Sequence, residues 1–246
     1  MNDKDIEKKR YNDAAYRALE AGNLSSANAL NLPLKAPYSF YESVISERLN
    51  SSDHVLEIGA GMGENTECLL ASGAKVCASD ISDVSLDILS RRFNVDNLSV
   101  KVADIERLPF EDCVFDMVVS AGSLSYGEHS SVINEIYRVL KPGGIFIAVD
   151  SLGHHPIYRL NRYVHYIRGK RSLSTLRRMP TLKLLADYEE KFGKVETHFF
   201  GSISYLTPLM NKVLGESVSA KISDSVDRII SVKGSAFKFV MVVEKI

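Results

Sequence analysis

The sequence predicts an α/β fold in which a parallel β-sheet carries helices on both faces. Three observations predict it: strand-like and helix-like runs alternate from residue 53 onward, a glycine-rich turn follows the first strand, and acidic residues end successive strands. We expect strands at residues 53–58, 74–79, 98–103, 114–120 and 144–150. The helices expected between them span residues 63–72, 83–93 and 130–140.

The first expected strand ends in a turn with Gly59, Gly61 and Gly63 at alternate positions. Glycine lacks a Cβ atom, so this turn can adopt positive φ angles and a ligand can approach the main chain closely. In the dinucleotide-binding fingerprint a third glycine follows one residue later, where this chain has Glu64. A carboxylate there would oppose a pyrophosphate. The turn therefore favours a nucleotide-like cofactor without phosphates and disfavours an NAD-dependent oxidoreductase.

The expected helices carry local end signals. Ser82 can cap the second helix, and Gly73 can end the first. The sequence Lys-Pro-Gly-Gly at residues 141–144 stops the third helix, since proline and glycine cannot continue it. These signals support the strand and helix order without indicating chemistry.

Acidic side chains end several of the expected strands. Glu57 ends the first strand, Asp80 the second, Asp104 the third and Asp150 the fifth. Each of them alone could be a turn residue, but ligands of parallel sheets bind at the carboxyl ends of the strands. Asp80 can accept both hydroxyl protons of a ribose, Asp104 can accept from an exocyclic amine, and Glu57 can attract an ammonium or sulfonium charge.

The regions before and after this core differ in composition. Residues 1–50 look helical and aromatic, and we expect them to form a lid or flank, or simply to pack on the core. Their aromatic residues are Tyr11, Tyr16, Tyr38, Phe40 and Tyr41, with Pro33 and Pro37 between them. Beyond the core we expect a helix at 181–192, a strand at 195–200, a helical stretch at 203–232 and a last strand at 237–243.

Residues 151–186 form a basic insertion that contains eight Lys or Arg residues and no Asp or Glu. Ile157, Leu160, Val164 and Ile167 recur in it at helical spacing. This pattern favours an anionic partner, which could be a phosphorylated or nucleotide-linked sugar, a polyprenyl-phosphate-linked glycan, or RNA. We expect at most weak peripheral contact with a membrane.

Composition limits the remaining choices. With 246 residues and a net charge of −1, the chain fits one domain, residues 51–246, preceded by the helical flank. The charged start does not resemble a signal peptide, and no apolar run is long enough to span a membrane. Cys68, Cys77 and Cys113 lack metal-binding spacing. We therefore expect a cytoplasmic protein without a structural disulfide or a metal site.

Four motifs in order give the chain a resemblance to class I S-adenosylmethionine-dependent methyltransferases of the type-11 group. They are Val55–Gly63, Ser79–Ser82, Ala103–Phe110 continued by Phe115–Ser120, and Arg138–Gly144. The resemblance implies a Rossmann-like, seven-stranded, mostly parallel sheet with an antiparallel last strand, and S-adenosylmethionine as cofactor. It departs from the common pattern at Ser125-Tyr126, where many members carry a histidine pair.

The resemblance also implies roles for individual residues. Glu57 and the glycine turn would hold the methionine end of the cofactor, and Asp80 would hold the ribose. The adenine would lie against Ile81, Asp104 and Ile105. The wall beside the methyl donor would consist of Ser120, Ala121 and Gly122.

The acceptor side is less specific. We expect His154 or His155 to be the general base, because a hydroxyl acceptor must lose a proton. Expected substrate contacts are Tyr126, Tyr158, Arg159 and Arg162. Residues 151–210 are similar to methyltransferases of bacterial surface-polysaccharide pathways, which favours O-methylation of a glycan or of a phosphorylated or anionic small molecule. Alternatives are a catalytically silent cofactor-binding module and an RNA methyltransferase, although nucleic acid is not the favoured partner.

Overall fold

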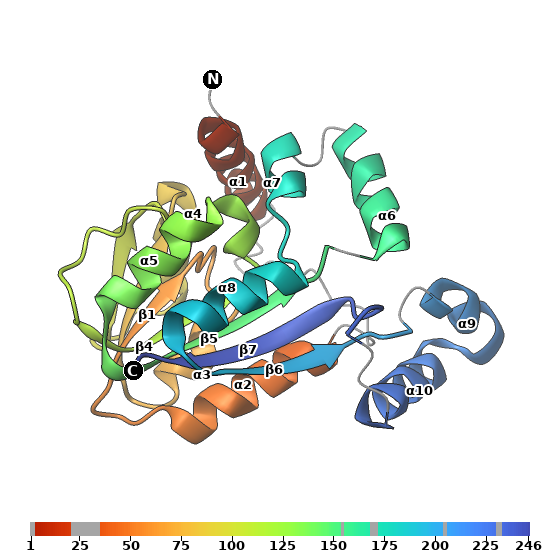
Figure 1. The fold of residues 1–246 in the computed structure, drawn as a ribbon. Coiled ribbons are helices and arrows are strands. Elements are labelled where there is room, and N and C mark those ends of the chain that lie inside the picture. Colours follow the sequence, from red (N-terminus) through yellow and green to blue (C-terminus); the bar gives the residue numbers. More distant parts are fainter. Residues whose placement is uncertain (1–2, 21–34, 154, 168–171, 204–205, 230–232) are drawn as a thin grey trace.

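The computed structural model describes residues 3–20, 35–153, 155–167, 172–203, 206–229 and 233–246. His154, residues 168–171 of the basic insertion and the proline at 33 therefore lie outside the described residues. Figure 1 shows one twisted sheet with helices packed on both sides of it. This arrangement confirms the predicted α/β class.

The chain alternates between helices and strands for most of its length. The helices are α1 Asp3–Glu20, α2 Lys35–Arg48, α3 Thr66–Leu70, α4 Asp83–Arg92, α5 His129–Val139, α6 Pro156–Ile167, α7 Leu173–Arg177, α8 Leu182–Phe192, α9 Thr207–Leu214 and α10 Glu216–Ile229. The strands are β1 His54–Ile58, β2 Lys75–Asp80, β3 Leu98–Val102, β4 Phe115–Ala121, β5 Leu140–Ser151, β6 Val195–Phe200 and β7 Lys238–Glu244.

The sheet has seven strands in the order β3-β2-β1-β4-β5-β7-β6. Strands β1 to β5 run parallel to one another, whereas β7 is antiparallel to both β5 and β6. The expected antiparallel last strand is therefore confirmed, and it lies between the fifth and sixth strands. Because parallel strands end at the same edge, the carboxyl ends of β1, β2, β4 and β5 meet there.

Two apolar layers enclose the sheet. One layer packs α5 and α8 against strand residues such as Leu56, Val118 and Phe146. The other packs α2 and α3 against the alternate strand residues, among them Val55 and Val119. Figure 1 shows these two helix pairs on opposite faces. The alternation of neighbouring strand residues between the layers explains why these strands read as continuous apolar runs.

Most predicted helix ends are confirmed, and one is wrong. The Ser82 hydroxyl accepts a hydrogen bond from the backbone N–H of Ser85, which caps α4 as expected. Helix α3 begins at Thr66 rather than at residue 63. The reason is that Gly61 and Gly63 have φ angles of 56° and 87°, which a right-handed helix cannot contain.

The first and last glycines of the turn after β1 allow close packing. A Cβ atom on Gly59 would lie 2.4 Å from the Cβ atom of Ser123, which follows β4. A Cβ atom on Gly63 would lie 2.8 Å from the ring of Phe93, just after α4. Gly59 therefore brings the turns after β1 and β4 together, and Gly63 seats the start of α3 against α4.

Helices outside the sheet layers lie at its edges and ends. Figure 1 shows α1, α7 and α6 near one another, and α9 and α10 projecting beyond β6. The helical stretch expected at 203–232 is thus a pair of helices, with residues 204–205 and 230–232 outside the described part. No helix in that described part combines the length and the apolar character needed to cross a lipid bilayer.

The packing at Gly59 predicts a difference between two alanine variants. Gly59→Ala and Gly143→Ala both place alanine at a positive φ, 68° and 74°, which costs about 1–2 kcal/mol. Only Gly59→Ala also overlaps Ser123, because no atom lies within 4 Å of a Cβ on Gly143. Gly59→Ala should therefore lose about 1–3 kcal/mol more in free energy of unfolding, measured by urea denaturation. Equal losses would contradict this packing.

Candidate functional site

A cavity of about 690 Å³ lies over the carboxyl ends of the parallel strands. The turn after β1, the end of β2, residues 103–105 and the segment after β4 form its floor. Helices α1 and α2 and the segment around α7 supply the remaining walls. Its volume is within the range of roughly 300–1,000 Å³ that is typical of small-molecule sites.

Asp80 organises one side of this cavity. One of its carboxylate oxygens accepts from the backbone N–H of Gly61 at 3.0 Å, and the other accepts from that of Ser82 at 2.8 Å. Burial raises the pKa of Asp80, although these two hydrogen bonds oppose the shift. Each carboxylate oxygen can accept a further hydrogen bond, so a ligand with two adjacent hydroxyls can bind both.

Asp104 lies farther along the same side and pairs with the N-terminal helix. Its carboxylate accepts from the Lys4 ammonium of α1, and Lys4 also pairs with Glu106 at 2.6 Å. The neighbouring Ile105 lines the cavity. The two acidic side chains raise the pKa of Lys4, although its partial burial has the opposite effect. Helix α1 thus closes the cavity at this end.

Glu57 and Ser120 lie behind the cavity wall. Glu57 is buried and accepts a hydrogen bond from the Thr66 hydroxyl at 2.6 Å. Burial raises the pKa of its carboxyl group to about 8, and the nearby charges of Glu64 and Asp80 add to this shift. The Ser120 hydroxyl is 2.6 Å from that of Ser123. Neither Glu57 nor Ser120 lines the cavity, whereas Ala121 and Gly122 do.

Helix α1 covers the cavity through contacts with several distant segments. The hydroxyls of Tyr11 and Tyr126 are 2.6 Å apart, and their rings meet edge to face. Burial raises the pKa of Tyr11 well above its ordinary value, and the neighbouring Tyr126 adds to the shift. Three further contacts hold the helix: Lys8 to Asp83 at 3.1 Å, Asn12 to Ser82 at 2.6 Å and Glu7 to Thr175 at 2.9 Å.

The opposite end of the cavity, over β5 and β7, combines one buried acid with basic side chains. The Asp150 carboxylate is fixed by the backbone N–H groups of Leu124 and Ser151, at 3.0 and 2.6 Å. Burial raises the pKa of Asp150, and the nearby charges of Lys238 and Arg162 lower it by less. The Lys238 ammonium donates to the hydroxyls of Tyr38 and Ser151.

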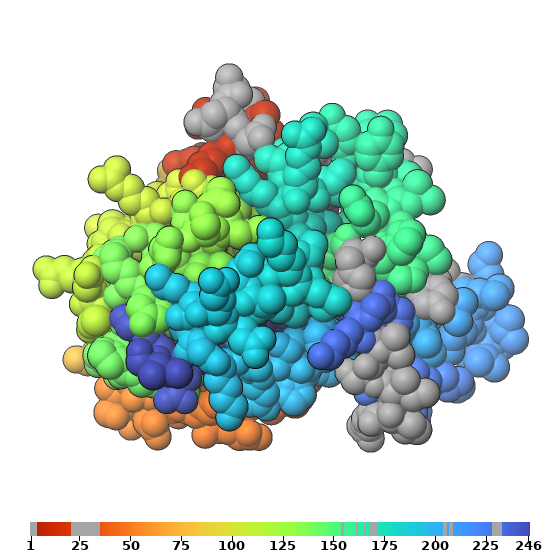
Figure 2. Space-filling view, viewed as in Figure 1, coloured from red at the N-terminus to blue at the C-terminus, as the bar shows by residue number. Residues whose placement is uncertain are grey.

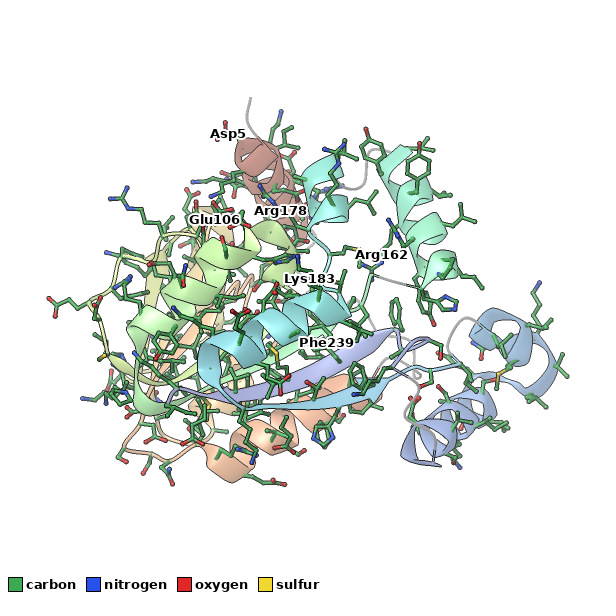
Figure 3. The ribbon with its side chains drawn as sticks, in the orientation of Figure 1. Asp5, Glu106, Arg162, Arg178, Lys183 and Phe239 are labelled. Atoms are coloured by element: carbon green, nitrogen blue, oxygen red, sulfur yellow. The ribbon has the colours of Figure 1, made fainter. Side chains whose placement is uncertain are left out.

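Two arginines also line the cavity, Arg162 near Asp150 and Arg178 near Glu106. Figure 3 shows Arg162 on the side of α6 that faces the sheet, and Arg178 beside Glu106. The Arg162 guanidinium is buried, lies 5.6 Å from the ring centre of Phe237 and donates to the Met179 sulfur. Arg178 is 3.9 Å from Glu106. The cavity is therefore acidic at the ends of β1 to β3 and mainly basic at the ends of β5 and β7.

Residues 56–148 match the family model described as a methyltransferase domain. The chain contains a class I, S-adenosylmethionine-dependent methyltransferase domain. The matched residues include the glycine turn, Asp80, Asp104 and all but the last part of β5. The family resemblance and the expected cofactor are therefore confirmed.

Curated relatives and solved structures are similar to this methyltransferase domain. A sterol 4-C-methyltransferase of Caenorhabditis elegans is 33% identical over 53% of this chain and 43% of its own length. A demethylmenaquinone methyltransferase of Clavibacter sepedonicus is 38% identical over 41% and 42%, respectively. The chain thus spans less than half the length of these relatives.

A solved structure shares the fold at low identity. Geranyl diphosphate C-methyltransferase from Streptomyces coelicolor, crystallised with Mg²⁺, geranyl diphosphate and S-adenosyl-L-homocysteine, has a TM-score of 0.58 and 15% identity. The match covers 87% of this chain and 80% of that one. At this identity the similarity concerns the fold of the methyltransferase domain alone.

Most residues predicted to bind the cofactor lie around the cavity of the methyltransferase domain. Those that line it are Gly59, Gly61, Asp80, Ile81, Asp104, Ile105, Ala121 and Gly122. Three do not line it: Glu57, Gly63 and Ser120. Glu57 and Ser120 support the wall from behind, and Gly63 packs against Phe93. The individual roles of all these residues remain predictions.

Only some of the residues predicted to contact the acceptor line the cavity. Tyr126 and Arg162 line the cavity, whereas Tyr158, Arg159 and His155 do not. His155 lies against the ring of Tyr158 at the start of α6, and the other predicted base, His154, lies outside the described residues. Within the described part of the chain, no cluster of three or more His, Cys, Asp or Glu residues is placed to hold a metal ion.

Sequence reasoning did not assign several residues of this cavity. Lys4, Glu7 and Tyr11 come from α1, and Lys238 comes from the last strand. Tyr11 belongs to the aromatic series of the N-terminal flank, and that series was the one sequence feature that could have indicated its place in the cavity. Lys238 carried a weaker signal, since it is the only basic residue at the start of a strand that is otherwise apolar through Val243.

Replacing Asp80 by Asn should weaken binding of S-adenosylmethionine and S-adenosylhomocysteine about 10- to 100-fold. A hydrogen bond to a charged acceptor contributes about 1.5–3 kcal/mol, and the amide group offers one oxygen in place of two. Calorimetric titration measures this change. Asp87→Asn, at an exposed position of α4, is the matched control and should bind normally. Normal binding by a stably folded Asp80→Asn protein would contradict the assignment.

The raised pKa of Glu57 predicts a pH-dependent stability difference. Between pH 4.5 and about 8 the unfolded state has released the proton that folded Glu57 keeps, so its contribution to stability falls as pH rises. Glu57→Gln lacks this proton, and its amide oxygen can still accept from Thr66. The melting temperature of Glu57→Gln relative to the natural protein should therefore increase from pH 5 to pH 8.

The control for this measurement is Glu47→Gln, at an exposed position of α2. Its melting temperature relative to the natural protein should stay constant over the same range of pH. A constant difference for Glu57→Gln as well would show that the Glu57 carboxyl is ionised in the folded protein.

Proposed function

We propose that this chain transfers the methyl group of S-adenosylmethionine to an oxygen atom of a small anionic acceptor, with Asp150 as the general base. The observation that carries the proposal is the buried Asp150 carboxylate in the cavity wall, with Lys238 and Arg162 close enough to influence its pKa. A hydroxylated acid, such as a sugar phosphate, has both groups that this end of the cavity can recognise.

The described residues fit S-adenosylmethionine at the other end of the cavity. Asp80 presents two carboxylate oxygens that can each accept one ribose hydroxyl. No atom lies within 4 Å of the position that a Cβ on Gly122 would occupy, so a ligand has room beside the main chain there. When bound, the cofactor supplies an electrophilic methyl group on a positively charged sulfur.

The acceptor would then lie over β5 and β7. The proposed cofactor contacts lie at the ends of β1 to β4. The part of the cavity that the cofactor would leave free therefore adjoins Asp150 and Lys238. Lys238 and Arg162 are only 7% and 8% exposed, which reduces solvent screening of their charges. The named substrates of the relatives, a sterol and demethylmenaquinone, differ from each other, so the acceptor is inferred from these side chains instead.

In the proposed reaction Asp150 accepts the proton of the acceptor hydroxyl. The acceptor oxygen uses the freed electron pair to form the new bond to the methyl carbon, and the electrons of the broken carbon–sulfur bond remain on sulfur as S-adenosylhomocysteine leaves. A raised pKa makes a carboxylate a stronger base, and the two backbone N–H donors keep Asp150 in one orientation. Arg162 and Lys238 would hold the anionic group of the acceptor.

Asp150 is preferred here over the predicted histidines. His155 does not line the cavity, and its ring lies against Tyr158 at the start of α6. Asp150, by contrast, lies at the carboxyl end of β5, the strand next to β4, beside the expected position of the methyl donor. The sequence had placed Asp150 at a strand end, where ligands of parallel sheets bind.

A screen with radiolabelled S-adenosylmethionine and a panel of hydroxylated anions tests this function. We expect a product methylated on oxygen, identified by mass spectrometry. Asp150→Asn should lower kcat about 10²- to 10⁴-fold and leave the affinity for S-adenosylhomocysteine unchanged, whereas Asp150→Glu should retain part of the activity. Glu190→Gln, at an exposed position of α8, is the control and should be fully active.

Two outcomes would contradict the proposal. A product methylated on carbon or nitrogen would remove the need for a base acting on a hydroxyl. Binding of S-adenosylhomocysteine without transfer to any acceptor would instead favour a catalytically silent module.

A further inference from the structure

A second cavity of about 690 Å³ lies between α6 and the segment formed by α7 and residues 178–181. Figure 1 shows α6 and α7 side by side, and Figure 2 shows both on the viewed surface of the molecule. None of the residues that line this cavity also lines the first one. It is therefore a separate space, and the proposed methyl transfer makes no use of it.

The polar part of this cavity is basic. Arg159 of α6 and Arg177 of α7 line it from opposite sides, and both are exposed. Neither guanidinium group forms an ion pair with any acidic residue in the described part of the chain. Two guanidinium groups that line one cavity without acidic partners are well suited to a phosphate group, because each offers a fork of parallel N–H donors.

The remaining lining is largely apolar. Leu160, Tyr163, Leu176 and Met179 line the cavity, and Leu160 and Tyr163 are 65% and 50% exposed. Ile157 and Ile167 on the same helix are also at least half exposed. An apolar chain bound along these side chains would remove their surface from water, which stabilises a complex by about 25 cal/mol per Å².

A thin wall separates the two cavities. Met179 and Thr181 line the second cavity, and Pro180 between them lines the first. The backbone N–H of Gly153 donates to the Pro180 carbonyl at 2.8 Å, which holds this segment against the end of β5. Arg162 reaches from α6 to Met179 on the inner side of the same wall. A ligand of the second cavity therefore lies next to the proposed acceptor position.

From this geometry we propose that the second cavity binds a phosphate ester that carries an apolar chain, such as an alkyl or isoprenyl phosphate. Arg159 and Arg177 bind the phosphate, and Leu160, Tyr163 and Leu176 contact the chain. The absence of acidic residues from 151–186 keeps the potential around the phosphate positive. Binding at this cavity does not require methyl transfer, so the proposal can be tested independently of the proposed function.

Calorimetric titration with dodecyl phosphate, below its micelle concentration, tests the site in the full chain. We expect saturable binding of one ligand per protein. Inorganic phosphate, which lacks the chain, and dodecyl maltoside, which lacks the charge, should each bind at least 10-fold more weakly. Leu160→Gln should also weaken binding of dodecyl phosphate, since it replaces apolar lining by an amide.

Paired variants separate a defined site from general attraction of anions. The double variant Arg159→Gln/Arg177→Gln should weaken binding of dodecyl phosphate at least 10-fold. The control Lys183→Gln/Lys212→Gln removes the same charge from exposed positions of α8 and α9 that line neither cavity, and it should bind normally. Equal loss in both double variants would overturn the proposal.

Sedimentation with vesicles distinguishes a bound amphiphile from adsorption to a charged surface. Vesicles of phosphatidylcholine with phosphatidic acid should bind the natural protein, and the Arg159→Gln/Arg177→Gln variant should bind them less. Binding to these vesicles without any binding of monomeric dodecyl phosphate would overturn the proposed cavity in favour of surface adsorption. Loss of dodecyl phosphate binding in a properly folded Asp80→Asn protein would also contradict it, because Asp80 lines only the first cavity.

Discussion

The close contact between Gly59 and Ser123 is the constraint on which the site depends. It brings the turn after β1 against the segment after β4, and the Ser123 hydroxyl, 3.3 Å from the Ile58 carbonyl, reinforces the contact. The backbone N–H of Gly61 is then positioned to donate to one carboxylate oxygen of Asp80. The other oxygen accepts from the backbone N–H of Ser82, two residues after the end of β2. Three strand ends thus share one rigid floor, which a side chain at residue 59 would separate.

The features that could be predicted from the sequence are those that depend on neighbouring residues. Strand periodicity, the Ser82 cap and the glycine turn are local, and they were sufficient for the α/β class and for the positions of Asp80 and Asp104. The antiparallel position of β7 followed from the family resemblance. The start of α3 was misplaced because helical propensity after residue 63 says nothing about the backbone angles that the turn requires.

Contacts between distant segments could not be predicted in the same way. Lys4 and Asp104 are 100 residues apart, and no periodicity or spacing indicates that they pair. The basic insertion was recognised from its charges. Only the structure shows that its residues belong to two sites, because Arg162 lines the first cavity and Arg159 lines the second. Arg159 and Arg162 are only three residues apart on α6, so charge density along the sequence cannot assign them to different cavities.

Helix α1 covers the first cavity through contacts with three separate segments. Lys4 pairs with Asp104 at the acidic end, Glu7 accepts from Thr175 of α7, and Tyr11 contacts Tyr126. The proposed cofactor and the proposed acceptor would therefore lie in one cavity under one helix. Thermodynamic reciprocity then requires that any factor by which bound cofactor changes the affinity for the acceptor also be the factor by which bound acceptor changes the affinity for the cofactor.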